Sequence, residues 1–103
     1  MAADGYRHGV FVVAMEVDLR ILDAHSLKDK RQVVKPLVEG VRRKFQVAAA
    51  ETASHDSWQR AQLGFAVVGS TAGHVQRVLD EVERYLWSRP GIEIISAERS
   101  WLE

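Results

Sequence analysis

The order in which hydrophobic periodicities change along the chain constrains its fold more than any other feature. Residues 10–22 are rich in β-branched and aliphatic side chains and alternate between apolar and polar from Ala14 onward. Apolar side chains then recur at helical spacing in 27–45 and return to strand-like patterns in 46–53 and 58–69. A second helical stripe begins after Ser70 and Thr71, and Pro90-Gly91 ends it before a last strand-like segment, 92–101. The predicted element order is therefore βαββαβ.

This order is typical of an α+β, ferredoxin-like plait, in which two right-handed crossovers flank a hairpin. We predict a four-stranded antiparallel sheet of order 4-1-3-2 with both helices on one face. Pro36 lies inside the first helix, where it costs ~3 kcal/mol in a regular helix, and we expect one kinked helix rather than two. Residues 9–103 are predicted to form a single domain, preceded by a flexible N-terminal extension, 1–8.

The composition argues against several classes of protein. The 103 residues include no cysteine, which excludes disulfides, thiolate nucleophiles and Cys-ligated zinc. We see neither a signal-peptide pattern nor an apolar run of ~20 residues, so we expect a cytoplasmic protein. No phosphate-binding loop, dinucleotide fingerprint or HExxH motif is present, and the consecutive residues His55-Asp56-Ser57 cannot form a catalytic triad. We predict no catalytic residue and no cofactor.

The formal net charge is zero, yet the charges are unevenly placed. Residues 28–44 carry seven basic side chains against Asp29 and Glu39, a balance of +5 that leaves −5 for the rest of the chain. Heptad spacing places several of the basic residues on one helix face, which would suit a nucleic-acid phosphate backbone. The candidate nucleic-acid-binding residues are Lys28, Arg31, Lys35, Arg42 and Arg43. The alternative is a solvated face whose last-turn cations complement the helix dipole.

A second group of polar residues is expected at one end of the sheet, where the first helix begins. The group comprises His25, Ser26, Lys28, His55, Asp56, Trp58 and Arg60. An anion site would use His25, Ser26, Lys28, His55 and Arg60, whereas a metal site would use His25, His55 and Asp56. The structural alternative is that Ser26 caps the helix, Trp58 plugs the end of the core and the histidines are solvated. Metal spacing motifs are absent, so we expect no metal.

The sheet face without helices is expected to be open. Its predicted outward residues are Val12, Ala14, Glu16, Asp18, Gly64, Ala66 and Val68, while Phe11 and Phe65 should point inward. Without an outward aromatic, base stacking in the manner of an RNA-recognition motif is not expected. The small apolar centre predicts a homodimer through this face or an edge strand. Glu16, Asp18, Arg20 and Arg60 are expected to form cross-strand charge pairs.

Three motifs carry a family resemblance: His25-Ser26-Leu27-Lys28-Asp29-Lys30-Arg31, Arg42-Arg43-Lys44-Phe45, and the segment from Asp56 to Gly64, DSWQRAQLG. Over residues 10–98 the chain resembles the YlxP-like family of bacterial proteins of unknown function. The resemblance implies a ferredoxin-like fold, a bacterial cytoplasmic setting and genes beside those of translation-initiation and ribosome-maturation factors. It implies no active site.

Two functional hypotheses follow. The favoured one is a non-enzymatic protein that binds structured RNA or a ribosomal particle through the basic face of the first helix. The alternative is an anion-binding protein or a phosphoester-handling enzyme that uses the polar group at the sheet end.

Overall fold

A computed structural model of the chain describes residues 9–102, so the extension predicted at 1–8 lies outside the described residues. The described residues form four strands, β2 (Phe11–Ile21), β3 (Ala48–Ala53), β4 (Arg60–Gly69) and β5 (Ile92–Leu102). Helix α1 (Leu27–Phe45) connects β2 to β3, and helix α2 (Ala72–Trp87) connects β4 to β5. The element order is βαββαβ, as the periodicities predicted. No helix within residues 9–102 is long and apolar enough to cross a membrane.

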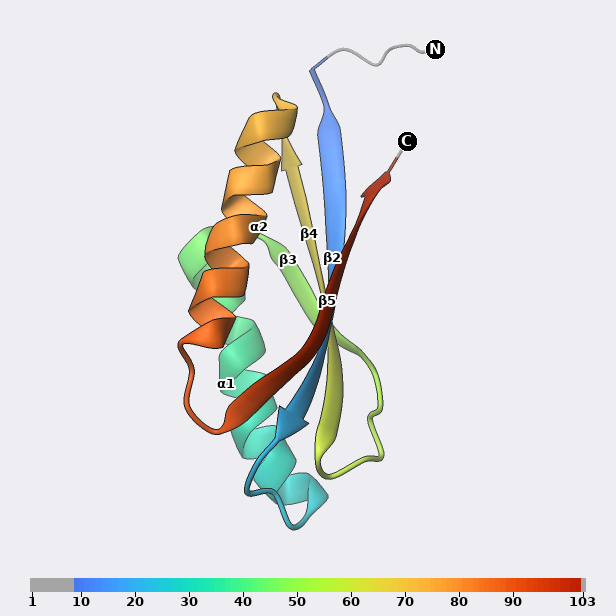
Figure 1. The fold of residues 1–103 in the computed structure, drawn as a ribbon, viewed down its shortest axis with the longest axis vertical. Helices are drawn as coiled ribbons and strands as arrows, with labels where there is room; N and C mark the ends of the chain where they lie inside the picture. The colour runs from blue at the N-terminus through green and yellow to red at the C-terminus, as the bar shows by residue number, and fades with distance from the viewer. Residues whose placement is uncertain (1–8, 103) are drawn as a thin grey trace.

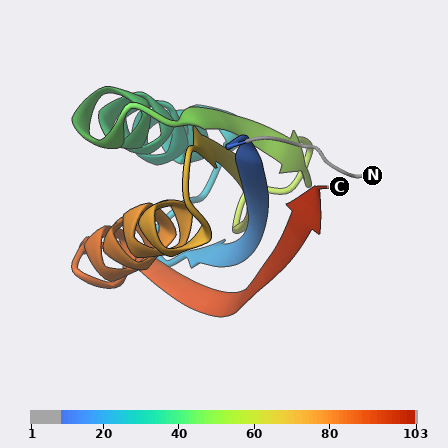
Figure 2. The same ribbon diagram turned by 90° about the horizontal axis from the view of Figure 1, so that it is seen from above.

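The four strands form one antiparallel sheet in the order β3-β4-β2-β5. If the strands are numbered 1 to 4 in chain order and read from the β5 edge, this is the predicted order 4-1-3-2. Both helices pack against the same face, and the other face is open (Figures 1 and 2). The ferredoxin-like plait is thus confirmed, with β2 and β4 at its centre and β3 and β5 at its edges.

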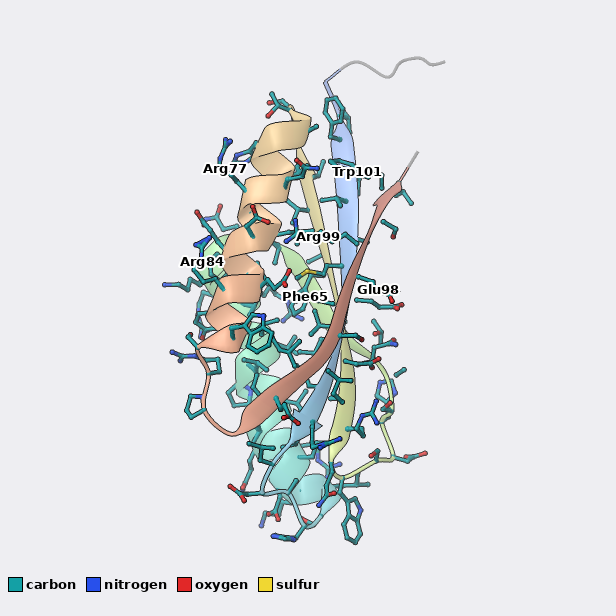
Figure 3. The ribbon with its side chains drawn as sticks, in the orientation of Figure 1. Phe65, Arg77, Arg84, Glu98, Arg99 and Trp101 are labelled. Atoms are coloured by element: carbon teal, nitrogen blue, oxygen red, sulfur yellow. The ribbon has the colours of Figure 1, made fainter. Side chains whose placement is uncertain are left out.

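The core lies between the helices and the odd-numbered side chains of the central strands. In β2 these are Val13, Met15, Val17 and Leu19, all buried. Phe65 of β4 lies opposite Met15 and is enclosed between sheet and helices (Figure 3). Each such side chain contributes roughly 1.5–3 kcal/mol relative to exposure. Phe11 was also predicted to point inward, but it is 37% exposed. It is the first residue of β2 and lies opposite Gly69, which offers no side chain to pack against.

Helix α1 is continuous through Pro36, so the prediction of one helix is confirmed. Its start is fixed by reciprocal capping: Ser26 Oγ accepts a hydrogen bond from the Asp29 amide at 3.0 Å, and Asp29 Oδ2 accepts one from the His25 amide at 3.0 Å. Its end is fixed by Gln46, which adopts a left-handed conformation and donates its amide to the Arg42 carbonyl. Pro36 is exposed, so water can satisfy the carbonyl that its missing N–H leaves free.

The open face is apolar at one end and charged in its middle. Val12 lies opposite Val68 on one side and Leu102 on the other, with Ala14 and Ala66 paired beside them. Val68 is 67% exposed and Leu102 70% exposed. We call Val12, Ala14, Ala66, Val68 and Leu102 the apolar patch.

Among residues 9–102, the four residues expected to form cross-strand charge pairs on the open face do not pair with one another. The register places Arg20 opposite Arg60, and Arg20 instead pairs with Glu93 of β5 at 3.4 Å. Glu16 lies opposite Gly64 and Glu98, and Glu98 points away from the helices (Figure 3). The expectation was wrong because the sequence alone did not reveal the strand register.

The apolar patch sustains the prediction of a homodimer. A specific interface buries roughly 800 Å² per partner and usually persists at about 100 µM, so light scattering at that concentration should give a dimer mass. Val68→Lys with Leu102→Lys should shift the mass to that of a monomer, while Trp87→Lys, which changes an exposed apolar residue on α2, should not. A monomeric wild-type protein would contradict the prediction.

Candidate nucleic-acid interface

A groove of about 570 Å³ runs between α1 and the edge strand β3. Its floor includes the apolar side chains Val34, Val38 and Ala50. Three exposed α1 cations, Arg31, Lys35 and Arg42, also line it, as do the exposed acidic residues Glu39 and Asp56. β3 is an edge strand, and α1 packs against it. We call this feature the α1–β3 groove.

Lys30 forms the buried base of the groove. Its side chain is 2% exposed, and Nζ donates to the Ser54 carbonyl at 2.6 Å and lies 2.9 Å from Glu51 Oε2. Glu51 Oε2 is itself buried and meets this ammonium as an ion pair rather than as an aligned hydrogen bond. Lys30 therefore joins the first turn of α1 to the end of β3. It was counted among the basic residues of 28–44, but its charge is not on the surface of the helix.

Two further polar side chains protect the outer edge of β3. Arg42 Nη2 donates to the Ala49 carbonyl at 2.6 Å. His55 Nε2 lies 3.3 Å from the Glu51 carbonyl and donates to it when that nitrogen carries the proton. Unpaired backbone groups on an edge strand invite pairing with another chain, and side-chain donors of this kind block it. Arg42 thus has a structural role that its place in the predicted basic face did not indicate.

The remaining basic residues of α1 are available to a partner. Lys28, Arg31, Lys35, Arg43 and Lys44 are exposed, and none of them lies within 4.0 Å of a carboxylate among residues 9–102. The Asp29 carboxylate is occupied by the helix cap. Without Lys30, six basic residues of α1 stand against Asp29 and Glu39, so the surface of this helix is still strongly positive.

The polar group predicted at the sheet end is only partly brought together. His55 and Asp56 line the α1–β3 groove, whereas His25, Ser26, Lys28 and Arg60 are not part of its lining. The Ser26 hydroxyl serves as the helix cap, as the structural alternative proposed. Within the described part of the chain, no three His, Cys, Asp or Glu side chains are grouped as a metal site would require.

Trp58 does not plug the core, contrary to that same structural alternative. Its side chain is 53% exposed, above a shallow hollow formed with Asp56, Ser57 and Gln59. Gln59 joins this loop to the end of β2 instead: its carbonyl accepts from the Ile21 amide at 2.9 Å, and its Nε2 donates to the Ala24 carbonyl at 3.3 Å. The size and apolar character of Trp58, next to a strand, suggested that it is buried. Its polar neighbour Gln59 makes the tertiary contact instead.

Comparison with known proteins agrees with this architecture. A de novo designed protein with ferredoxin fold, solved by solution NMR, superposes with a TM-score of 0.50 at 18% identity, covering 89% of this chain and 85% of the design. The chain therefore has the class of fold that its topology defines. Residues 12–99 match a family described as protein of unknown function (DUF503), and the chain belongs to that family. It is 36% identical to the uncharacterized protein YlxP of Bacillus subtilis (strain 168) over 86 residues, which cover 84% of this chain and 94% of that protein.

The structure explains much of the two longer motifs that carried the resemblance. In the first, Ser26 and Asp29 build the helix cap and Lys30 anchors α1. In the motif from Asp56 to Gly64, Gln59 ties the loop to β2. Gly64 leaves room for Thr52, whose Cγ2 would lie 2.8 Å from a Cβ at that position. The exposed members Lys28, Arg31 and Trp58 have no such structural role, which makes them the better functional candidates.

The role assigned to Lys30 is tested by replacing it. Lys30→Met should lower the free energy of unfolding by about 3 kcal/mol, because it leaves the Glu51 carboxylate buried without its counter-charge. Lys30→Met combined with Glu51→Leu should recover most of that loss. Lys28→Met, an exposed neighbour on the same helix, should change stability by less than about 0.5 kcal/mol. Equal effects of Lys28→Met and Lys30→Met in urea denaturation would contradict the assignment.

Proposed function

We propose that this protein binds structured RNA or a ribosomal particle through the basic face of α1, without catalysing a reaction. The observation that carries the proposal is the row of exposed α1 cations that have no carboxylate partner among residues 9–102. Unpaired cations along a helix interact with phosphates by releasing the counterions condensed on the nucleic acid.

The distribution of these cations supports an extended partner over a compact substrate. Lys28 lies in the first turn of α1, Arg31 and Lys35 follow along the groove, and Arg43 lies in the last turn. At 1.5 Å per residue, the 15 steps from Lys28 to Arg43 span roughly 22 Å. Successive phosphates of one strand are a few ångströms apart, so a helix of this length can follow several of them. A single small anion would leave most of these charges unused.

The open face offers less support for nucleic-acid binding. Its central strands present Val12, Ala14 and Glu16 against Val68, Ala66 and Gly64, with no aromatic side chain among them. Glu16 and Glu98 lie opposite each other on this face and would repel a phosphate backbone. RNA binding across the sheet therefore fits the side chains poorly, and α1 is the better interface.

The proposal is tested by sedimentation with ribosomal subunits over a series of salt concentrations. The ribosomal particle is the first partner to try because the family resemblance implies a setting in translation. Wild-type protein should co-sediment at low salt, and its log affinity should fall linearly with log salt concentration, by about 0.7–0.9 per phosphate contact. Arg31→Glu with Lys35→Glu should weaken binding and lower that slope by about 1.5.

The chain provides a matched control for this experiment. Arg77 and Arg84 lie on the outer side of α2 (Figure 3) and have no carboxylate partner among the described residues. Arg77→Glu with Arg84→Glu produces the same change in net charge and should leave binding much less affected. Arg42 is excluded from the variants because its bond to β3 is structural. Equal losses in the two double variants, or no co-sedimentation of the wild type, would contradict the proposal.

A further inference from the structure

Trp58 is a large aromatic side chain that the fold does not use. It is 53% exposed in the loop between β3 and β4, and Gln59 provides the contacts that hold this loop to β2. An exposed indole on a loop gains little of the stabilisation that full burial of its apolar surface would give. A binding role would account for its position.

Trp58 lies where the α1–β3 groove ends. Asp56 lines both the groove and the shallow hollow, of about 290 Å³, that Trp58 helps to form. The two depressions therefore adjoin at this one residue. A ligand lying along Arg31 and Lys35 can extend past His55 and Asp56 to the indole of Trp58.

Cations beside an accessible aromatic ring are the elements of a single-stranded nucleic-acid site. Cationic side chains follow the backbone, and an unpaired base stacks on the ring whatever its identity, because every base has a π-face. In double-stranded RNA the bases are already stacked on one another, so a ring of this kind selects loops, bulges and ends.

We propose that Trp58 stacks on an unpaired base of an RNA whose backbone lies along α1. This inference rests on the proposed function and adds its substrate class: RNA with a single-stranded segment next to the contacted phosphates. Stacking involves no counterion release, so the contribution of Trp58 to affinity is independent of salt, unlike that of Arg31 and Lys35.

A second exposed tryptophan lies in a different environment. Trp87, at the end of α2, is 64% exposed and lies in a hollow with Asp80, Glu83, Arg84 and Arg99. The carboxylates of Asp80 and Glu83 already pair with Arg99 there. This hollow does not share a residue with the α1–β3 groove, so Trp87 is a matched control for Trp58.

The test uses fluorescence anisotropy with three labelled RNA hairpins: blunt-ended, with a short single-stranded overhang, and with an abasic overhang of the same length. Wild-type protein should bind the normal overhang about 5- to 100-fold more tightly than the abasic one, the factor that stacking of one base provides. Trp58→Ala should abolish this preference and leave the salt slope unchanged, while Trp58→Phe should retain most of it. Trp87→Ala should behave as wild type.

The outcomes separate this inference from the proposed function. If Arg31→Glu with Lys35→Glu weakens binding but Trp58→Ala does not, the phosphate contacts stand and the stacking role is wrong. If Trp58→Ala weakens normal and abasic overhangs equally, its contact is not with a base and the inference is likewise wrong. If wild-type protein binds none of the three hairpins or the ribosomal subunits at low salt, the proposed function fails together with the inference.

Discussion

The buried ion pair between Lys30 and Glu51 joins the first turn of α1 to β3 at the base of the groove. Lys30 is the one charged side chain of residues 9–102 that is fully buried, and its Nζ contacts both Glu51 and the Ser54 carbonyl. A buried charge is tolerated only with a partner in place, so the first turn of α1, the end of β3 and the following loop are held in one arrangement. Since Lys30 points inward, the helix turns Arg31 and Lys35 toward the groove.

The same anchoring separates basic residues that build the fold from those that are free to bind. Lys30 and Arg42 donate to backbone carbonyls of β3 and of the loop after it, and with His55 they leave little of that strand's outer edge open. Lys28, Arg31, Lys35, Arg43 and Lys44 remain exposed. Because the contacts of each cation show whether the fold depends on it, substitutions can remove the proposed phosphate contacts without breaking the fold.

The element order, the strand order and the continuity of α1 could be predicted from periodicity, capping and turn residues, since these are local or follow from chain topology. The contacts that define the site could not. Lys30, Arg31 and Lys35 are all basic residues of the same helix, and only the tertiary packing shows that Lys30 is buried. A shift of one residue in the start of β2 or β4 would change the register that places Arg20 opposite Arg60. Hydrophobicity favours burial of Trp58, yet its side chain is exposed. Gln59 makes the contact with the rest of the fold instead, because its amide can donate to the Ala24 carbonyl.

The central claim is that the protein meets RNA along α1 and the loop that follows β3, and an amide chemical-shift map tests it most directly. A ¹⁵N-labelled sample titrated with the overhang hairpin should show its largest shifts at residues 27–44 and 54–60, with the β5 amides and the outer side of α2 little changed. The indole N–H of Trp58 should move further than those of Trp87 and Trp101. Shifts concentrated on the open face of the sheet or on α2 would contradict the account.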